Sequence, residues 1–287
     1  SAEKFCLAKK RLVYEELFLL QCGLMLNRER NCDGRPGIRH DRDGDTIHRV
    51  LQNLPFTLTE SQQKAWADIS GDMEDVKPMH RLLQGDVGSG KTVIAALALA
   101  KTVENGFQGC IMAPTGILAQ QHFETLTEFF KGTGVTIKIL TGNTKAAERR
   151  EILQELLDGS LKILIGTHAL LQDDVVFGHL ALVVTDEQHR FGIDQRIALL
   201  KKAPSDITMH QLVMTATPIP RTLQLALFSD LDVSTLDELP KGRKPIITAV
   251  MPDTRKAEVI KRLDEVCHQQ KEEIKSLDNT TKASKNQ

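Results

Sequence analysis

Residues 85–92 bring glycines, a lysine and a hydroxyl side chain together in a spacing that suits phosphate binding. They read Gly85, Asp86, Val87, Gly88, Ser89, Gly90, Lys91 and Thr92, between an apolar strand-like run and a helix-like run. Glycines let backbone amides approach an anion, and the N-terminus of the following helix adds a favourable partial charge. Lys91 can reach the outer phosphates of a nucleotide, and Thr92 can ligate Mg²⁺. The pattern predicts an ATP-binding loop, with a glycine-rich turn that binds no phosphate as the alternative.

A second group of chemically useful residues follows the apolar run 180–185, which reads as a buried strand and delivers Asp186 and Glu187 at its end. Opposite a phosphate loop, Asp186 is predicted to hold the metal, usually through water. Glu187 is predicted to be the general base that orients and deprotonates the attacking water. The alternative is a solvated acidic pair at a strand end, and the phosphate loop in the same chain favours the catalytic interpretation.

The elements that must position these residues are short apolar runs that alternate with helical patterns from Leu51 onward. The expected strands are 81–84, 109–112, 136–140, 162–165, 180–185 and 211–214. Such alternation predicts an α/β fold with a mostly parallel sheet covered by helices on both faces. Ligands of such folds bind at the carboxyl ends of the strands, where both groups of residues fall.

The two ends of the chain have a different pattern. Residues 9–30 read as an amphipathic helix, and the turn-rich stretch 31–45 as an exposed loop. After a basic linker, 245–250 reads as a strand and 254–274 as a charged helix, before a polar tail that we expect to be disordered. We therefore predict three parts: an N-terminal linker helix and loop (1–50), an ATP-binding domain (51–240), and a linker with the incomplete start of a second domain and the tail (241–287).

Composition sets limits on partners and environment. The 37 Lys plus Arg against 38 Asp plus Glu give a formal charge of −1, so any nucleic-acid surface must be a local patch. The five cysteines are scattered without a Cys-x-x-Cys pair, which favours reduced thiols in a cytosol. The most apolar N-terminal stretch, 17–26, is far shorter than the ~20 residues that a membrane span needs, and we expect no membrane contact.

The residues Asp186, Glu187, Gln188 and His189 resemble the DExH box of superfamily 2 helicases, and other segments match that family in the expected order. The resemblance implies a RecA-like domain and adds Gln188 and His189 to the catalytic set. The run 214–218 resembles the helicase motif that couples hydrolysis to DNA movement, with the hydroxyls of Thr215 and Thr217 able to bond the acidic box from a neighbouring strand. Its alternative interpretation is an ordinary strand-to-turn exit that ends at a proline.

The run 54–62 resembles the adenine-recognition motif of these motors. The resemblance implies that Gln62 bonds the adenine edge in both directions, because an amide offers a donor and an acceptor, and that Phe56 stacks on the ring. The alternatives are a helix cap at Thr59 and a phenylalanine of the core.

Two segments that each follow a predicted strand, 113–121 and 166–171, resemble loops that track a DNA strand. Backbone amides and small hydroxyls can bind phosphates there without sequence preference. The expected DNA-binding residues are Pro114, Thr115, Gln120, Thr167 and His168. A histidine such as His168, taken alone, is more often structural.

The runs 82–92, 186–192 and 214–223, with the linker 237–245, look like the first motor domain of the RecG family of branched-DNA helicases, over residues 9–269 or so. This resemblance implies ATP hydrolysis, with Mg²⁺, coupled to unwinding of replication forks and Holliday junctions in recombination and repair. It also implies a monomer in the bacterial cytoplasm, with DNA, a second helicase domain and a wedge domain as partners.

The arginine-bearing motif of the second domain and the N-terminal wedge domain are missing from the sequence, so we expect a fragment whose turnover alone is poor. Two alternatives stay open. One is a double-stranded DNA translocase of the transcription-repair coupling type. The other is a non-catalytic ATP-binding module.

Overall fold

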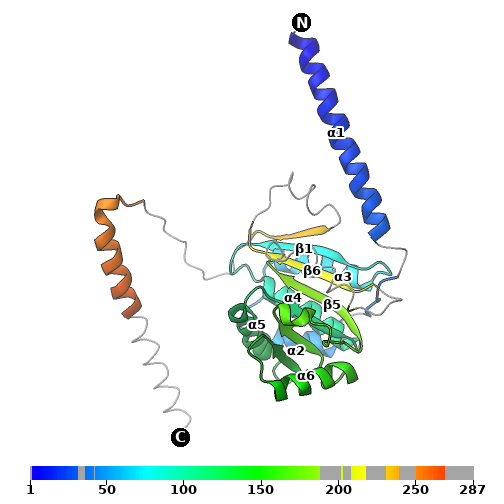
Figure 1. The fold of residues 1–287 in the computed structure, drawn as a ribbon, viewed down its shortest axis with the longest axis vertical. Coiled ribbons are helices and arrows are strands. Elements are labelled where there is room, and N and C mark those ends of the chain that lie inside the picture. Colours follow the sequence, from blue (N-terminus) through cyan, green and yellow to red (C-terminus); the bar gives the residue numbers. More distant parts are fainter. Residues whose placement is uncertain are drawn as a thin grey trace. The chain divides into compact units, whose positions relative to one another are not determined.

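The computed structural model of the protein describes residues 2–31, 36–41, 43–187, 202, 208–217, 231–238 and 250–268. The chain divides into two compact units, residues 1–241 and 242–287. The first unit is built on one sheet of seven strands with helices packed against it (Figure 1).

All seven strands of the sheet run parallel, in the order β3-β4-β2-β5-β6-β1-β7. They are β1 (His80–Gly85), β2 (Gln108–Met112), β3 (Ile137–Leu140), β4 (Ile163–Gly166), β5 (Leu180–Asp186), β6 (His210–Thr215) and β7 (Asp232–Leu236). The predicted α/β fold with a parallel sheet is confirmed, and each of the six predicted strands is present. The seventh, β7, was missed because it is a short strand, bonded only to β1, with alternating exposed and buried residues and no long apolar run.

The helices are α1 (Ala2–Asn31), α2 (Asp45–Asn53), α3 (Glu60–Glu74), α4 (Lys91–Glu104), α5 (Gly116–Phe129) and α6 (Ala146–Asp158), with 3₁₀ turns η1 (His168–Leu171) and η3 (Asp253–Arg255). The second unit is helical over 256–268. The predicted leading helix and the predicted charged helix are therefore present. The predicted strand at 245–250 and the tail at 275–287 fall mostly or wholly outside the described residues. Within the described part of the chain, no helix is long and apolar enough to cross a bilayer.

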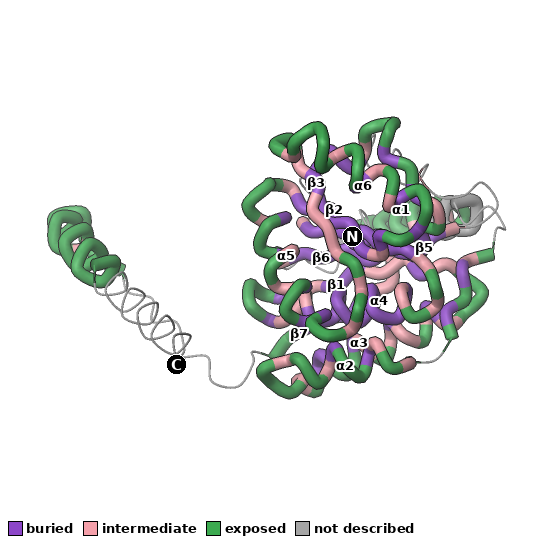
Figure 2. Tube along the Cα trace, turned by 90° about the horizontal axis from the view of Figure 1, so that it is seen from below, coloured by how far each residue is buried: buried purple, intermediate pink, exposed green. Residues whose placement is uncertain are grey.

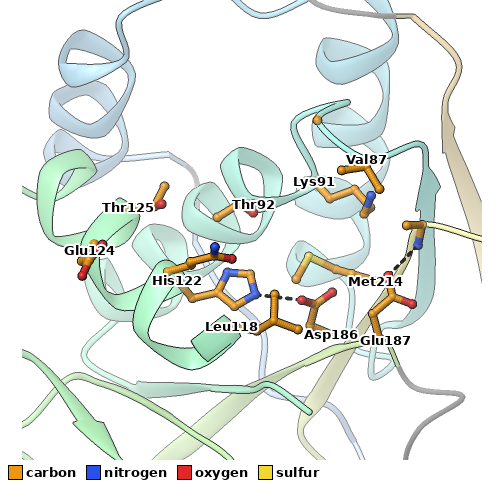
Figure 3. Close-up of a pocket in the computed structure, with 13 residues that line it drawn as sticks. Val87, Lys91, Thr92, Leu118, His122, Glu124, Thr125, Asp186, Glu187 and Met214 are labelled. Carbon is orange, nitrogen blue, oxygen red and sulfur yellow. Dashed lines mark hydrogen bonds and ion pairs between the residues drawn. The ribbon is translucent and has the colours of Figure 1, made fainter. Parts of the chain in front are cut away.

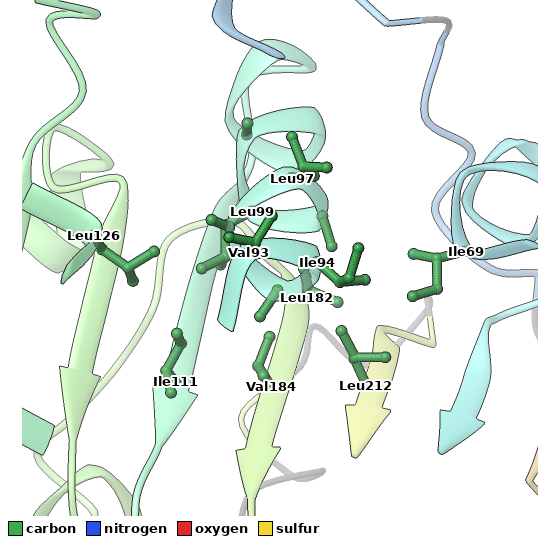
Figure 4. Close-up of a cluster of buried hydrophobic side chains, with 14 of the residues drawn as sticks. Ile69, Val93, Ile94, Leu97, Leu99, Ile111, Leu126, Leu182, Val184 and Leu212 are labelled. Atoms are coloured by element: carbon green, nitrogen blue, oxygen red, sulfur yellow. The ribbon is translucent and has the colours of Figure 1, made fainter. Parts of the chain in front are cut away.

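Helix α4 is the centre of the core on one face of the sheet. Its residues 93–102 are all buried, and they pack with α2, α3 and α5 against the strands (Figures 2 and 4). Successive residues of β5 face opposite sides: Leu182 and Val184 join this cluster, and Val183 joins a second cluster on the other face. Strand β5, fully buried and apolar over 180–184, thus carries Asp186 to the carboxyl edge of the sheet between two packed layers.

The segment that precedes α2 differs from the exposed loop expected at 31–45. We call the described residues 36–41 and 43–44 the strap. Ile38 and His40 are buried, at 8% and 0% exposure. The Gly37 amide donates to Val76 O at 2.6 Å and the His40 amide to Met73 O at 2.9 Å. The prediction of an exposed loop was wrong for this part, because polar and turn-forming residues flank two alternate positions that face inward.

Candidate nucleotide-binding site

The loop 86–90 connects the end of β1 to the start of α4, as predicted. Gly88 and Gly90 have φ of 78° and 93°, in the left-handed region that favours glycine. A Cβ at Gly90 would also collide with the side-chain amide of Gln62. Gly90 is the N-cap of α4 and supplies no side-chain cap. The first backbone amides of α4 are therefore available to an anion, and the helix N-terminus favours negative charge there.

Lys91 begins α4 and is folded back onto its own loop. Its Nζ donates to Gly85 O at 2.7 Å and to Asp86 O at 2.9 Å. Burial lowers the pKa of Lys91, and the charges of Asp186 and Glu187 oppose that shift. The ammonium group is thus half-buried and bonded to neutral carbonyls, which phosphate oxygens can replace as acceptors.

The acidic pair lies at the carboxyl end of β5, where Asp186 is in register with Met214 of the neighbouring strand β6. Glu187 has a φ of 53°, a left-handed conformation that costs a non-glycine residue roughly 1–3 kcal/mol. Its amide donates to Met214 O at 2.9 Å, and the Ala216 amide donates to its Oε1 at 3.1 Å. The backbone at 214–216 therefore holds a strained Glu187 in one orientation.

The hydroxyls of Thr215 and Thr217 bond each other, with 2.9 Å between their Oγ1 atoms. Two bonds of this segment to Glu187 are described above, and they involve the Met214 carbonyl and the Ala216 amide. Gln188 and His189 lie outside the described residues.

The sequence reasoning missed His122, on α5. Its Nε2 lies 2.9 Å from Asp186 Oδ2, and both side chains are about nine-tenths buried. The signal that could have found it is the helical spacing of Ala119, His122, Leu126 and Phe129, which are the buried residues of α5. A histidine on such a face needs a polar partner inside the fold.

These groups surround one cavity of about 540 Å³ at the carboxyl edge of the sheet (Figure 3). It is lined by Val87, Gly88, Lys91, Thr92, Leu118, Gln121, His122, Glu124, Thr125, Asp186, Glu187, Met214 and Ala216. The predicted phosphate-loop, metal-binding and base residues thus meet in one place. The Thr92 hydroxyl and the Asp186 carboxylate are hard oxygen donors of the kind Mg²⁺ prefers.

A family model described as DEAD/DEAH box helicase matches residues 59–226. The chain belongs to this helicase family. It is 47% identical over 253 residues to the ATP-dependent DNA helicase RecG of Thermotoga maritima, covering 88% of this chain and 32% of the relative. It is 46% identical over 246 residues to RecG of Bacillus subtilis, covering 86% of this chain and 36% of that relative.

A solved structure of RecG bound to a three-way DNA junction matches with a TM-score of 0.76 and 42% identity, covering 88% of this chain and 34% of that chain. The predicted resemblance to RecG helicases and the RecA-like fold are confirmed. The chain spans about a third of the length of these relatives.

The residues predicted to recognise adenine lie outside the cavity lining. Gln62 is 1% exposed, and both ends of its amide have protein partners. Its Oε1 accepts from the Thr59 amide at 2.9 Å, which completes a capping box, and its Nε2 donates to Ser89 O at 2.7 Å. Gln62 thus ties the start of α3 to the loop 86–90. Phe56 is 42% exposed.

The two predicted tracking loops begin side by side. Met112 at the end of β2 is in register with Gly166 at the end of β4, and the Ala113 amide donates to Gly166 O at 2.8 Å. Thr115 caps α5, accepting from the Leu118 amide at 3.3 Å. Of the five predicted DNA-binding residues, Thr115, Gln120 and His168 are exposed. Pro114 is half-buried and Thr167 is buried.

Proposed function

We propose that this chain is the ATP-binding and ATP-hydrolysing half of a DNA helicase motor, which in the whole protein acts on branched DNA such as forks and junctions. The observation that carries the proposal is the convergence on one cavity of Lys91 and Thr92 from the start of α4 with Asp186 and Glu187 from the end of β5. Family membership and RecG relatives on both the sequence and the structural side support it.

In this proposal the phosphates of ATP lie against the amides of 86–92. Lys91 exchanges its bonds to Gly85 O and Asp86 O for bonds to the outer phosphate oxygens. Thr92 and Asp186 would hold Mg²⁺, which would neutralise charge on the phosphates when bound. The chain's own contribution is a prepositioned set of donors and acceptors at the edge of a rigid sheet.

Glu187 is the proposed base. Its Oε1 is fixed by the Ala216 amide, so the carboxylate is held toward the cavity before substrate arrives. Because residues 214–216 belong to β6 and its exit, movement of that segment would reorient Glu187. This contact is our proposed link between hydrolysis and the predicted coupling motif that contains Thr215 and Thr217.

We further propose that the paired loops after β2 and β4 contact the DNA backbone through Pro114, Thr115, Gln120, Thr167 and His168. Their adjacency at one edge supports a continuous track. Adenine recognition by Gln62 and Phe56 is also part of the proposal, and it requires Gln62 to give up its bond to Ser89 O or to the Thr59 amide.

The test is steady-state phosphate release from this chain, with and without forked DNA, beside a longer chain that adds the segment following this region in RecG relatives. This chain is expected to hydrolyse ATP slowly and with little DNA stimulation, since the cavity supplies one wall of the site and leaves charge on the transferred phosphoryl half-neutralised. The longer chain is expected to be strongly DNA-stimulated. Equal DNA-stimulated rates would contradict the half-motor proposal, and the absence of hydrolysis from both would favour a non-catalytic binding module.

A further inference from the structure

The floor of the cavity contains a side-chain contact that the reaction scheme above does not use. His122 reaches from α5 to Asp186 at the end of β5, and Figure 3 shows the imidazole pointing at one oxygen of the carboxylate. The two residues are 64 positions apart in sequence, and their atoms are 2.9 Å apart.

The direction of this bond follows from chemistry. A carboxylate only accepts hydrogen bonds, so Nε2 of His122 carries the proton and donates to Oδ2, whether the ring is neutral or charged. The other carboxylate oxygen lies on the side away from the ring (Figure 3). The bond therefore fixes the rotation of the Asp186 side chain and leaves one oxygen to face a ligand.

Packing alone does not explain a histidine at this position. The neighbouring buried residues of the same helix face, Ala119, Leu126 and Phe129, are apolar. An imidazole buried among them costs free energy unless its polar atoms are bonded. Its Nε2 is bonded to the carboxylate proposed to hold the metal, and both side chains line the cavity.

We infer that His122 is a positioning residue that orients the Asp186 carboxylate for Mg²⁺ bound together with nucleotide. The inference rests on the proposed function and deepens it. Some side chains hydrogen-bond a metal ligand without touching the metal. Their removal typically lowers metal affinity by about 10–100-fold. We therefore expect His122 to affect nucleotide affinity in the presence of Mg²⁺. Nucleotide affinity without Mg²⁺, which depends on the phosphate loop, should not depend on His122.

The experiment measures the affinity of this chain for a fluorescent ATP analogue, in EDTA and across a Mg²⁺ titration, together with thermal unfolding of each variant. His122→Leu keeps the bulk and suits the apolar face but removes the donor. His122→Gln restores an amide donor near the place of Nε2. His122→Asn keeps a polar side chain that is too short to reach Asp186, and it replaces the leucine variant in the comparison if that variant does not fold. Glu128→Gln, an exposed position on the same helix, is the matched control.

For His122→Leu we expect the Mg²⁺ concentration at half-effect to rise by about 10-fold or more, with unchanged affinity in EDTA and an undiminished melting temperature. His122→Gln should largely recover the Mg²⁺ response, and Glu128→Gln should match the wild type.

A wild-type Mg²⁺ response in His122→Leu, or an equal loss of affinity in EDTA and in Mg²⁺ with a lowered melting temperature, overturns the inference and leaves His122 a packing residue. If the wild-type chain itself shows no Mg²⁺-dependent nucleotide binding, the proposed function fails first, and this inference fails with it.

Discussion

Helix α4 has a lysine near each end, and the two residues have opposite environments. Lys91, in the first turn at the carboxyl edge of the sheet, is half-buried and donates to the neutral carbonyls of Gly85 and Asp86. Lys101, in the last turn, is completely buried and donates to Asp43, Glu74 and Ser70 at 2.9, 2.6 and 2.7 Å.

The difference separates binding from stability. All three donors of the Lys101 ammonium have side-chain acceptors, two of them carboxylates, so this group ties the strap and α3 to α4 and has no capacity for a ligand. Lys91 is held by acceptors that a phosphate can replace. A buried charge with a complete set of partners indicates structure, and a buried charge with exchangeable neutral partners at a cavity indicates a site.

The largest expected effect is on hydrolysis at the Lys91 end. In the longer, DNA-stimulated chain, Glu187→Gln should lower kcat by about 10²–10⁴-fold, because the amide cannot accept the proton of the attacking water. Binding of ATP with Mg²⁺ should be preserved. Phosphate release and analogue binding measured on the same preparation check this, and a parallel loss of both would mark Glu187 as structural.

Lys91→Ala should weaken binding of an ATP analogue by about 100-fold or more, because it removes the one fixed cationic side chain of the phosphate loop and its charge-assisted bonds. The melting temperature should change little. Isothermal titration calorimetry gives the affinity. Unchanged affinity would refute the assignment of 85–92 as a phosphate loop.

Lys101→Met is the matched change at the other end and should leave analogue affinity unaltered. It should destabilise the fold by about 2 kcal/mol. This is below the usual cost of breaking a buried ion pair, because Asp43 and Glu74 are 37% exposed and can rehydrate. The melting temperature should fall by about 4–8 °C. A loss of ATP affinity with an intact fold would remove the distinction between the two lysines.

A further expected effect concerns pH at the Lys101 end. Burial lowers the pKa of His40 to about 4. The charge of Lys101 lowers it further, and Asp41 and the Ile38 and Met73 carbonyls oppose the shift.

Burial likewise lowers the pKa of His210 to about 3. The neighbouring His40 and His80 lower it further, and the Ile38 carbonyl opposes the shift. The Met79 amide donates to Nδ1 of His210 at 2.9 Å, which requires that nitrogen to be unprotonated.

Histidines in the unfolded chain have a pKa of about 6.5, so below that pH they bind protons that His40 and His210 do not bind in the folded chain. The stability that the neutral histidines contribute is therefore fully present above about pH 6.5, and it is lost as the pH drops toward 4. The limiting slope is about 1.4 kcal/mol per pH unit for each histidine. His210→Gln keeps an acceptor for Met79 and should flatten this dependence. Melting temperatures between pH 7 and 4.5 test it, and identical slopes in both proteins would contradict it.

The same contrast explains what the sequence could predict. The phosphate loop is a contiguous run, β5 is an unbroken apolar run that ends in Asp186, and both were predicted at the right edge of the right fold. The partners of Lys101 lie up to 58 residues away, His122 meets Asp186 across 64, and His40 meets His210 across 170. No local spacing encodes such pairs, because they form only when the sheet order brings distant segments together. Gln62 was predicted as a ligand-binding amide, but its bond to Ser89 across 27 residues depends on how α3 packs beside the loop.

The most direct test of the account is a structure of this chain with Mg²⁺ and a non-hydrolysable ATP analogue. It should place the phosphates against the amides of 86–92, with Lys91 Nζ released from Gly85 O and Asp86 O and bonded to a phosphate oxygen, while Lys101 keeps its three partners. Nucleotide bound elsewhere, or bound in this cavity with Lys91 still bonded to its own loop, would contradict the account.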